Sequence, residues 1–243
     1  MSWLPFIFAL FLVVVHLLAQ YIHVIDSISK KRVLSIAGGV SVAYVFIHIL
    51  PEFKHHQEAI EQQAEWLSFL EHHVYMTSML GLIIFYGLEK AVKHSKKKYK
   101  EEYGENKPSP GAFWVHMSSF FVYNALIGYL LVHREGEGGW VNLLLYSIAM
   151  GLHFFVVDYS LRTHHKDRYT NKGRWILSIA LLVGWGVGAL TEIPDPMLAL
   201  LFAFLSGAII LNVLKEELPE ERQSSYWSFA LGAAGYMILL IAV

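Results

Sequence analysis

Histidine and acidic side chains interrupt several apolar stretches of this sequence. An ionisable group inside an apolar span is costly and is a functional candidate by default. Asp158 is the clearest acid in such a stretch, and the histidines there are His16, His23, His48, His116 and His153. Neutral imidazole can ligate a borderline metal ion or relay a proton, and carboxylate is a further ligand type. These residue types predict the handling of an ion inside a bundle.

His153 is the best single candidate ligand. It precedes Arg162 by nine residues, which is about 13.5 Å along a helix and places it near the middle of a membrane. The alternative is an interhelical hydrogen bond to a polar neighbour. Asp158 lies about 140° round the helix from His153. Because Asp158 is also four residues before Arg162, an ordinary ion pair is its alternative role.

Two other groups of polar residues follow helical spacing. His16, Gln20, His23 and Ser27 form one stripe, which must face protein or water rather than lipid; it lines a pathway or packs against a polar helix. The second group combines His48 and Glu52 with the histidines and acid that follow them: His55, His56, Glu71, His72 and His73. Its residue types suit Zn²⁺, and the alternatives are a recruitment site or a solvated polar cap.

The elements that must position these residues are membrane-spanning helices. Of the 243 residues, 55% are hydrophobic and only 16% charged, against roughly 25% charged in soluble domains. About 20 apolar residues cross a bilayer. We predict one transmembrane domain over 1–243, an all-α bundle of eight spans without a cleaved leader or lipid anchor. The spans cover approximately 3–25, 33–50, 73–92, 111–132, 140–161, 175–190, 197–214 and 224–243.

Basic residues predict the orientation, since Lys and Arg accumulate on the cytoplasmic side. With these spans, all but Lys54 and Arg134 of the 19 Lys and Arg residues fall on one side. Both termini are therefore expected outside, with a flexible cytoplasmic loop at 93–110. Lipid and a divalent metal ion are the expected partners, and no nucleic acid is expected. The chain has no cysteine, which excludes thiolate metal sites and cysteine nucleophiles.

Two segments 168 residues apart are similar. GVSVAYVFIHILPE at 39–52 and GAIILNVLKEELPE at 207–220 share five of 14 positions. The first runs inward to outward and the second outward to inward. This favours an inverted repeat that relates the first three spans to the last three, as in many secondary transporters. Chance similarity of apolar sequence is the alternative.

The segment AGGVSVAYVFIHILPEF at 37–53 resembles the second span of the ZIP (Zrt/Irt-like) metal transporters, and SGAIILNVLKEELPE at 206–220 resembles their seventh. This resemblance implies eight spans and uptake of a divalent metal, commonly Zn²⁺, toward the cytoplasm. The family's metal site uses H-N-x-P-E-G-like and H-E-x-P-E-G-like motifs in spans four and five. Here His153 matches the leading histidine, but Phe154 replaces the next acid. Asp158 and Asn124 are approximate matches, and neither span has the family's proline.

The sequence therefore leaves three functions open. The first is a divergent ZIP-like carrier of Zn²⁺ or a similar cation, with metal candidates His153, Asp158, Asn124, His48 and Glu52, and with His16, Gln20 and His23 as further candidates. The second is a ZIP-fold protein that has lost transport and acts as a sensor, scaffold or partner subunit. The third is a membrane redox protein that binds haem between histidines. We expect no enzyme, because no nucleophile is paired with a base. Gly184 and Gly188 suit a close helix contact, either within one chain or in a homodimer.

Overall fold

The computed structural model of the protein describes residues 3–19, 21, 27–63, 73–133, 139–217 and 225–242. These residues are almost wholly helical and contain no strand. The elements in chain order are α1 (Leu4–Leu18), α2 (Ser27–Tyr44), η2 (Val45–Ile49), α3 (Leu50–Gln63), α4 (His73–Tyr103), α5 (Pro110–His133), α6 (Gly139–His165), η5 (Tyr169–Gly173), α7 (Arg174–Leu190), α8 (Asp195–Asn212), η6 (Val213–Glu217) and α9 (Tyr226–Ile241), where η marks a π-helix.

Several of these helices can cross a membrane. In the described part of the chain, five helical segments are long and apolar enough: Ile28–Glu58, Pro110–His133, Gly139–His165, Tyr169–Leu190 and Asp195–Lys215. The helices α1 and α9 are shorter and also apolar. A helix pairs its own backbone N–H and C=O groups, and this is required in a membrane because hydrocarbon offers no hydrogen-bond partner. The predicted all-α, multi-pass membrane bundle is confirmed.

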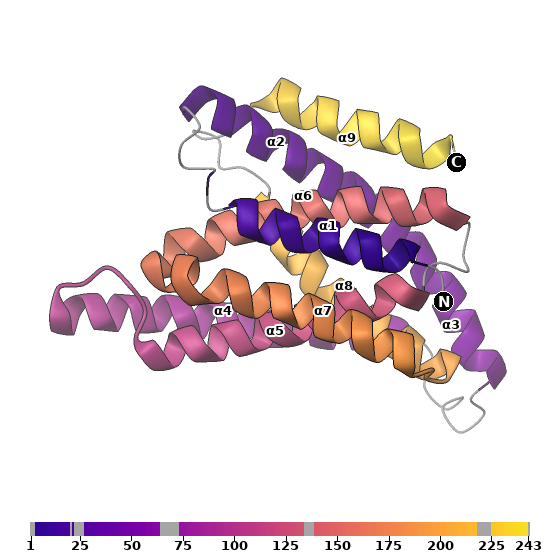
Figure 1. The fold of residues 1–243 in the computed structure, drawn as a ribbon, viewed down its shortest axis with the longest axis horizontal. Coiled ribbons are helices and arrows are strands. Elements are labelled where there is room, and N and C mark those ends of the chain that lie inside the picture. Colours follow the sequence, from indigo (N-terminus) through magenta and orange to yellow (C-terminus); the bar gives the residue numbers. More distant parts are fainter. Residues whose placement is uncertain are drawn as a thin grey trace.

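Most helices run roughly in one direction, so the bundle has two ends at which the helix termini and connections lie (Figure 1). Both chain ends lie at one end, together with α3. The turn between α4 and α5 lies at the other end, where the lysines of 93–100 gather. We call these the terminal end and the basic end.

Two connections extend the helices beyond the predicted spans, as the helical spacing of His48 and Glu52 allowed for the segment after Pro51 but not for 93–110. The segment 93–110, expected to be a flexible loop, continues α4 as far as Tyr103. Pairs such as Lys98 and Glu102, one turn apart with 3.7 Å between Nζ and Oε1, support an exposed helix there. The second predicted span does not end at Leu50, because α3 continues the helix past Pro51 to Gln63.

The π-helix η2 explains how the helix passes Pro51. A proline ring clashes with the carbonyl four residues earlier and has no N–H to donate. A wider π-turn at Val45–Ile49 accommodates this defect directly before Pro51. The π-helix η6 lies at Val213–Glu217, 168 residues later, and the sequence has Pro219 in the position that matches Pro51. The two similar segments therefore share an irregularity as well as residues.

The same offset recurs in the closest helix contacts. On α2, Gly39 packs against the backbone of Phe229 and Ala233 of α9, too closely for any side chain. On α8, Gly207 packs in the same way against Ser78 and Leu82 of α4. Thus α2 crosses α9 as α8 crosses α4, which is the arrangement that an inverted repeat of spans two and three with seven and eight requires.

A third close crossing joins α5 and α7. Gly184 lies against the backbone of Ala125, and Gly188 lies near the backbone of Tyr129. The G-x-x-x-G pair is therefore used inside one chain and gives no support to a homodimer. This crossing fixes α5, which carries Asn124, against the scaffold.

Candidate cation site

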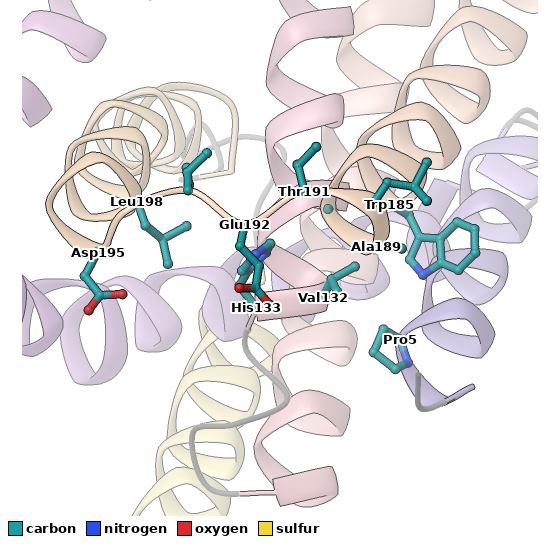
Figure 2. Close-up of a pocket in the computed structure, with 12 residues that line it drawn as sticks. Pro5, Val132, His133, Trp185, Ala189, Thr191, Glu192, Asp195 and Leu198 are labelled. Atoms are coloured by element: carbon teal, nitrogen blue, oxygen red, sulfur yellow. The ribbon is translucent and has the colours of Figure 1, made fainter.

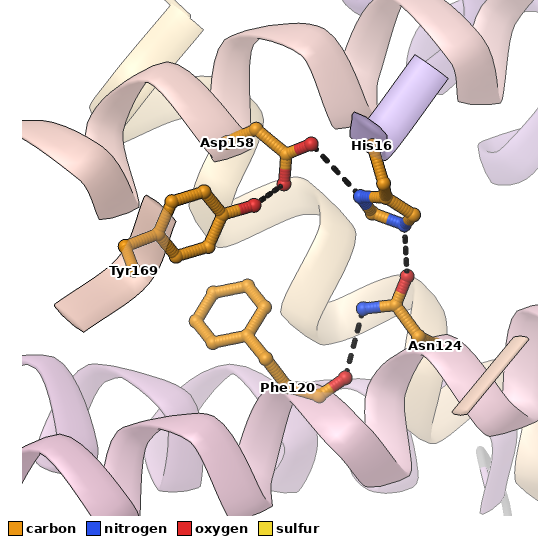
Figure 3. A network of polar contacts seen from close by, with 5 residues as sticks. All are labelled: His16, Phe120, Asn124, Asp158 and Tyr169. Atoms are coloured by element: carbon orange, nitrogen blue, oxygen red, sulfur yellow. Dashed lines mark hydrogen bonds and ion pairs between the residues drawn. The ribbon is translucent and has the colours of Figure 1, made fainter. Parts of the chain in front are cut away.

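Three helices bring a histidine, an amide and an acid together in the interior. His16 of α1 lies between Asp158 of α6 and Asn124 of α5 (Figure 3). The distance from His16 Nδ1 to Asp158 Oδ2 is 2.8 Å, and that from His16 Nε2 to Asn124 Oδ1 is 2.9 Å. Each of the three residues is 1% exposed. We call these three residues the His16 group.

The orientation of Asn124 is fixed by its own helix. Its Nδ2 donates to the backbone oxygen of Phe120 at 2.8 Å, so its Oδ1 faces His16. Reversing the amide would bring two oxygens together. Both ring nitrogens of His16 therefore face acceptors. This environment suits the imidazolium form, in which both nitrogens donate.

The second carboxylate oxygen of Asp158 is also occupied. Tyr169, the first residue of η5, donates its hydroxyl to Asp158 Oδ1 (Figure 3). The ring of Phe154 stacks on His16 with 4.4 Å between centroids. These aromatic neighbours shield the pair from water, and they strengthen its electrostatic interaction. An imidazolium and a carboxylate cancel in charge, which makes a buried site tolerable.

His153 lies close by in sequence but has a different partner. It is fully buried, and its Nε2 is 2.5 Å from the hydroxyl of Tyr123 on α5. The angle between positions 153 and 158 on a helix directs them to different faces. The contact to Tyr123 matches the interhelical hydrogen bond that the sequence offered as its alternative role. His153 and Tyr123 thus form a direct polar contact between α5 and α6.

Of the predicted stripe on the first span, His16 belongs to the site, but Ser27 is the first residue of α2 and does not continue the first helix. Gln20 and His23 lie outside the described residues. His48 and Glu52 do meet, since the helix continues through η2 into α3. Their Nε2 and Oε1 atoms are 2.9 Å apart, and both side chains are about one-fifth exposed. This pair lies away from the His16 group, toward the terminal end.

The terminal end also has the cavity shown in Figure 2, of about 670 Å³, between α1, α5, α7 and α8. Its lining includes the ionisable side chains of His133, Glu192 and Asp195. His133 Nδ1 is 3.0 Å from the backbone oxygen of Tyr129, so Nδ1 donates and Nε2 is left as the acceptor nitrogen. The cavity therefore offers carboxylates and an imidazole lone pair at this end.

No three histidine, aspartate or glutamate side chains converge so that they could hold a metal ion in the parts of the chain that the structure covers. The His16 group supplies one imidazole, one carboxylate and one amide oxygen. A cation held there would need further ligands from water or from a movement of neighbours such as Tyr169. The group by itself therefore does not complete the ligand set of a structural metal site.

Sequence reasoning did not identify Tyr123 and Tyr169 as partners of the buried polar residues. Tyrosine is common in membrane helices and at their ends, so neither residue carries a distinguishing pattern. It also did not join His116, which was noted, to His165. Their common feature, a place near the same end of adjacent helices, follows only from the topology.

The fold and the buried polar groups define a class, an all-α, multi-pass membrane protein with ionisable residues inside its bundle. Comparison with protein-family models, curated proteins and solved structures gives no match. The relation to ZIP transporters therefore stands as the resemblance of spans two and seven.

Proposed function

We propose that this protein is a ZIP-like carrier that moves a divalent metal cation, such as Zn²⁺, across a membrane toward the cytoplasm. The observation that carries the proposal is the meeting of His16, Asn124 and Asp158, from three helices, inside an apolar bundle. A bundle that needed only stability would gain as much from apolar side chains there.

The chemistry of the His16 group fits a cation as cargo. Imidazole nitrogen and carboxylate oxygen are both ligands of Zn²⁺, and the amide oxygen of Asn124 is a neutral third ligand. The proton on His16 and the metal ion would occupy the same lone pair, so a cation can enter only as a proton leaves. With a proton bound, the charges of imidazolium and carboxylate cancel. With a metal cation bound, the carboxylate again has a positive partner. In neither state does the carboxylate lack a counter-charge.

The architecture also supports a carrier. Inverted repeats let one site face either side of a membrane in turn. The repeat-related crossings, α2 on α9 and α8 on α4, have a π-helix at matching positions. π-Helices are frequent at functional sites because they interrupt the regular hydrogen bonding of a helix.

The proposed direction of transport follows from the distribution of Lys and Arg residues. The basic end carries most of the lysines and arginines, so we place it in the cytoplasm and both termini outside. The cavity with His133, Glu192 and Asp195 then faces outward. Carboxylates in a hollow attract cations to its mouth.

Metal uptake into sealed proteoliposomes tests the proposal. We expect the purified protein to carry at least one of Zn²⁺, Fe²⁺ and Mn²⁺, and His16→Ala and Asp158→Asn to reduce the rate by at least about tenfold. His94→Ala is the matched control, because His94 is exposed on α4 beyond the apolar segment. A protein that carries none of the three ions would contradict the proposal.

The second candidate is a ZIP-fold protein without transport, acting as a sensor, scaffold or partner subunit. Two observations favour it. Each member of the His16 group already has a hydrogen-bond partner within the protein. The described residues also contain no group of three side chains that could hold a metal ion. It predicts no flux for any of the three ions, together with a specific protein that co-purifies and is lost on disruption of the bundle surface.

A further inference from the structure

A second buried polar network lies at the basic end of the bundle. It consists of Glu89 of α4, His116 of α5, His165 of α6 and Lys215 of η6, which we call the Glu89 network. His116 Nδ1 is 2.9 Å from His165 Nε2, and His116 Nε2 is 3.1 Å from Glu89 Oε1. Lys215 Nζ pairs with Glu89 Oε2. Four separate elements thus meet through ionisable groups.

The Glu89 network is distinct from the His16 group. No residue is shared. His116, His165 and Lys215 lie near the basic ends of their helices, and Glu89 lies in the middle of the long helix α4. His165 is the last residue of α6, and Lys215 is close to the end of its helix. Glu89, His116 and His165 are 7%, 1% and 2% exposed, so the charges here are paired within the protein rather than by water. The proposed function gives this network no role.

The contact between the two imidazoles has room for one hydrogen. Which ring carries that hydrogen decides whether His116 Nε2, facing Glu89, and His165 Nδ1 carry hydrogens. With both rings neutral and His165 Nε2 donating, His116 accepts on Nδ1 and carries its hydrogen on Nε2. That nitrogen lies 3.1 Å from Glu89 Oε1, close enough for an ion pair but not aligned as a hydrogen bond. This leaves the Nδ1 lone pair of His165 as the free proton acceptor. That atom is buried and has no hydrogen-bond partner.

A proton added to His165 Nδ1 has a route toward the negative charge. His165 can pass its Nε2 hydrogen to His116 Nδ1, which makes His116 an imidazolium and returns His165 to neutrality. The positive charge then lies beside Glu89 rather than one ring farther away, and Coulomb attraction favours that position in a buried site. One proton enters, one hydrogen is transferred, and the hydrogen bond between the rings reverses.

We propose that the Glu89 network is a proton-binding site, separate from the cation site, that takes up one proton at His165 and holds the resulting charge on His116. Other charged groups modulate it. Lys215 shares the carboxylate of Glu89, and Lys96 of α4 and His164 of α6 lie near enough to act on the charge of His165. Burial of His165 opposes uptake most, these positive neighbours oppose it further, and Glu89 favours it. The site does not depend on metal transport.

Nitrogen NMR of the full chain in liposomes, labelled with ¹⁵N-histidine, tests the proposal, since the shift of each ring nitrogen reports whether it carries hydrogen. His116→Gln and His165→Gln assign the signals. At about pH 8 we expect both rings to be protonated on Nε2 alone. As the pH is lowered, His116 should become protonated on both nitrogens while His165 changes to Nδ1 alone.

Glu89→Gln supplies the control, because it removes the charge that draws the proton to His116. In this variant His116 should stay neutral at the pH that charges it in the natural chain. If Glu89→Gln fails to fold, Lys215→Met replaces it, and there His116 should take up the proton at higher pH. A doubly protonated His165 beside a neutral His116, or two rings that keep their tautomers throughout, would overturn the proposal.

Discussion

His16 and Asp158 lie 142 positions apart in the sequence, yet their imidazole and carboxylate are 2.8 Å apart inside the bundle. The contact joins α1 to α6 inside the bundle. Both side chains are buried, so each satisfies a polar group of the other that water does not reach.

Removing one member of this pair should destabilise the protein strongly. His16→Leu leaves the Asp158 carboxylate without its imidazole, and a buried charge without a partner costs roughly 3–5 kcal/mol. His16→Leu combined with Asp158→Leu should cost less than the sum of the two single changes. Unfolding midpoints in detergent for the natural chain and the three variants measure this coupling. Additive effects would show that the two residues do not interact.

The glycine crossings should behave as a related pair. Gly39→Ala and Gly207→Ala each force a methyl group against a neighbouring helix backbone, and we expect each to lower stability by about 1–3 kcal/mol. Gly87→Ala is the matched control, since a methyl group at this position on α4 meets no atom within 4 Å. Thermal unfolding of the purified protein is the measurement. If Gly87→Ala were as harmful as the other two, the close crossings would not be the cause.

Substitutions of Lys215 and of Lys98 should differ sharply in how much stability they cost. Lys215→Met removes the lysine partner of the buried Glu89, and we expect a loss of roughly 2–4 kcal/mol. Lys98→Met breaks the pair with Glu102, whose side chains are 66% and 50% exposed, and should cost no more than about 1 kcal/mol. Denaturation of both variants in the same detergent compares them directly. Equal losses would mean that the burial of Glu89 has no energetic effect.

The orientation can be tested without removing any native thiol, because the chain has no cysteine. Lys97→Cys lies on the exposed part of α4 at the basic end, and Lys54→Cys lies on α3 toward the terminal end. In intact cells, a thiol reagent that cannot cross membranes should label Lys54→Cys and spare Lys97→Cys. Permeabilised cells should label both. The reverse pattern would invert the proposed topology.

Tyr169→Phe should separate positioning from folding at the cation site. It removes the hydroxyl that donates to Asp158, and a hydrogen bond to a charged group contributes about 1.5–3 kcal/mol. If the protein carries cations as proposed, we expect a changed KM for uptake with little change in the quantity of folded protein. Tyr129→Phe is a suitable comparison, because its buried hydroxyl has no hydrogen-bond partner. Equal uptake kinetics in both variants would remove Tyr169 from the site.

The sequence predicted some of the site and missed the rest for a physical reason. His16, Asn124 and Asp158 were each candidates, because polar groups in apolar spans are conspicuous. Their meeting could not be predicted, since spacing along one helix says nothing about which other helix it faces. His153 was the leading candidate, but it hydrogen-bonds to Tyr123 rather than to a member of the His16 group. Whether His153 also binds a cation remains a prediction.

The sequence by itself determined the helices, their number in outline and the resemblance between 39–52 and 207–220, because these depend on runs of apolar residues and on local identity. It did not predict the π-helix η2 before Pro51, the π-helix η6 that follows α8, or the helix that continues α4 to Tyr103. Only the tertiary structure decided that Gly39 meets α9, that Gly207 meets α4 and that His16 meets Asp158. Hydrocarbon accepts any apolar helix equally, so the choice of neighbours rests on close packing and on paired polar groups, and these are properties of the assembled bundle.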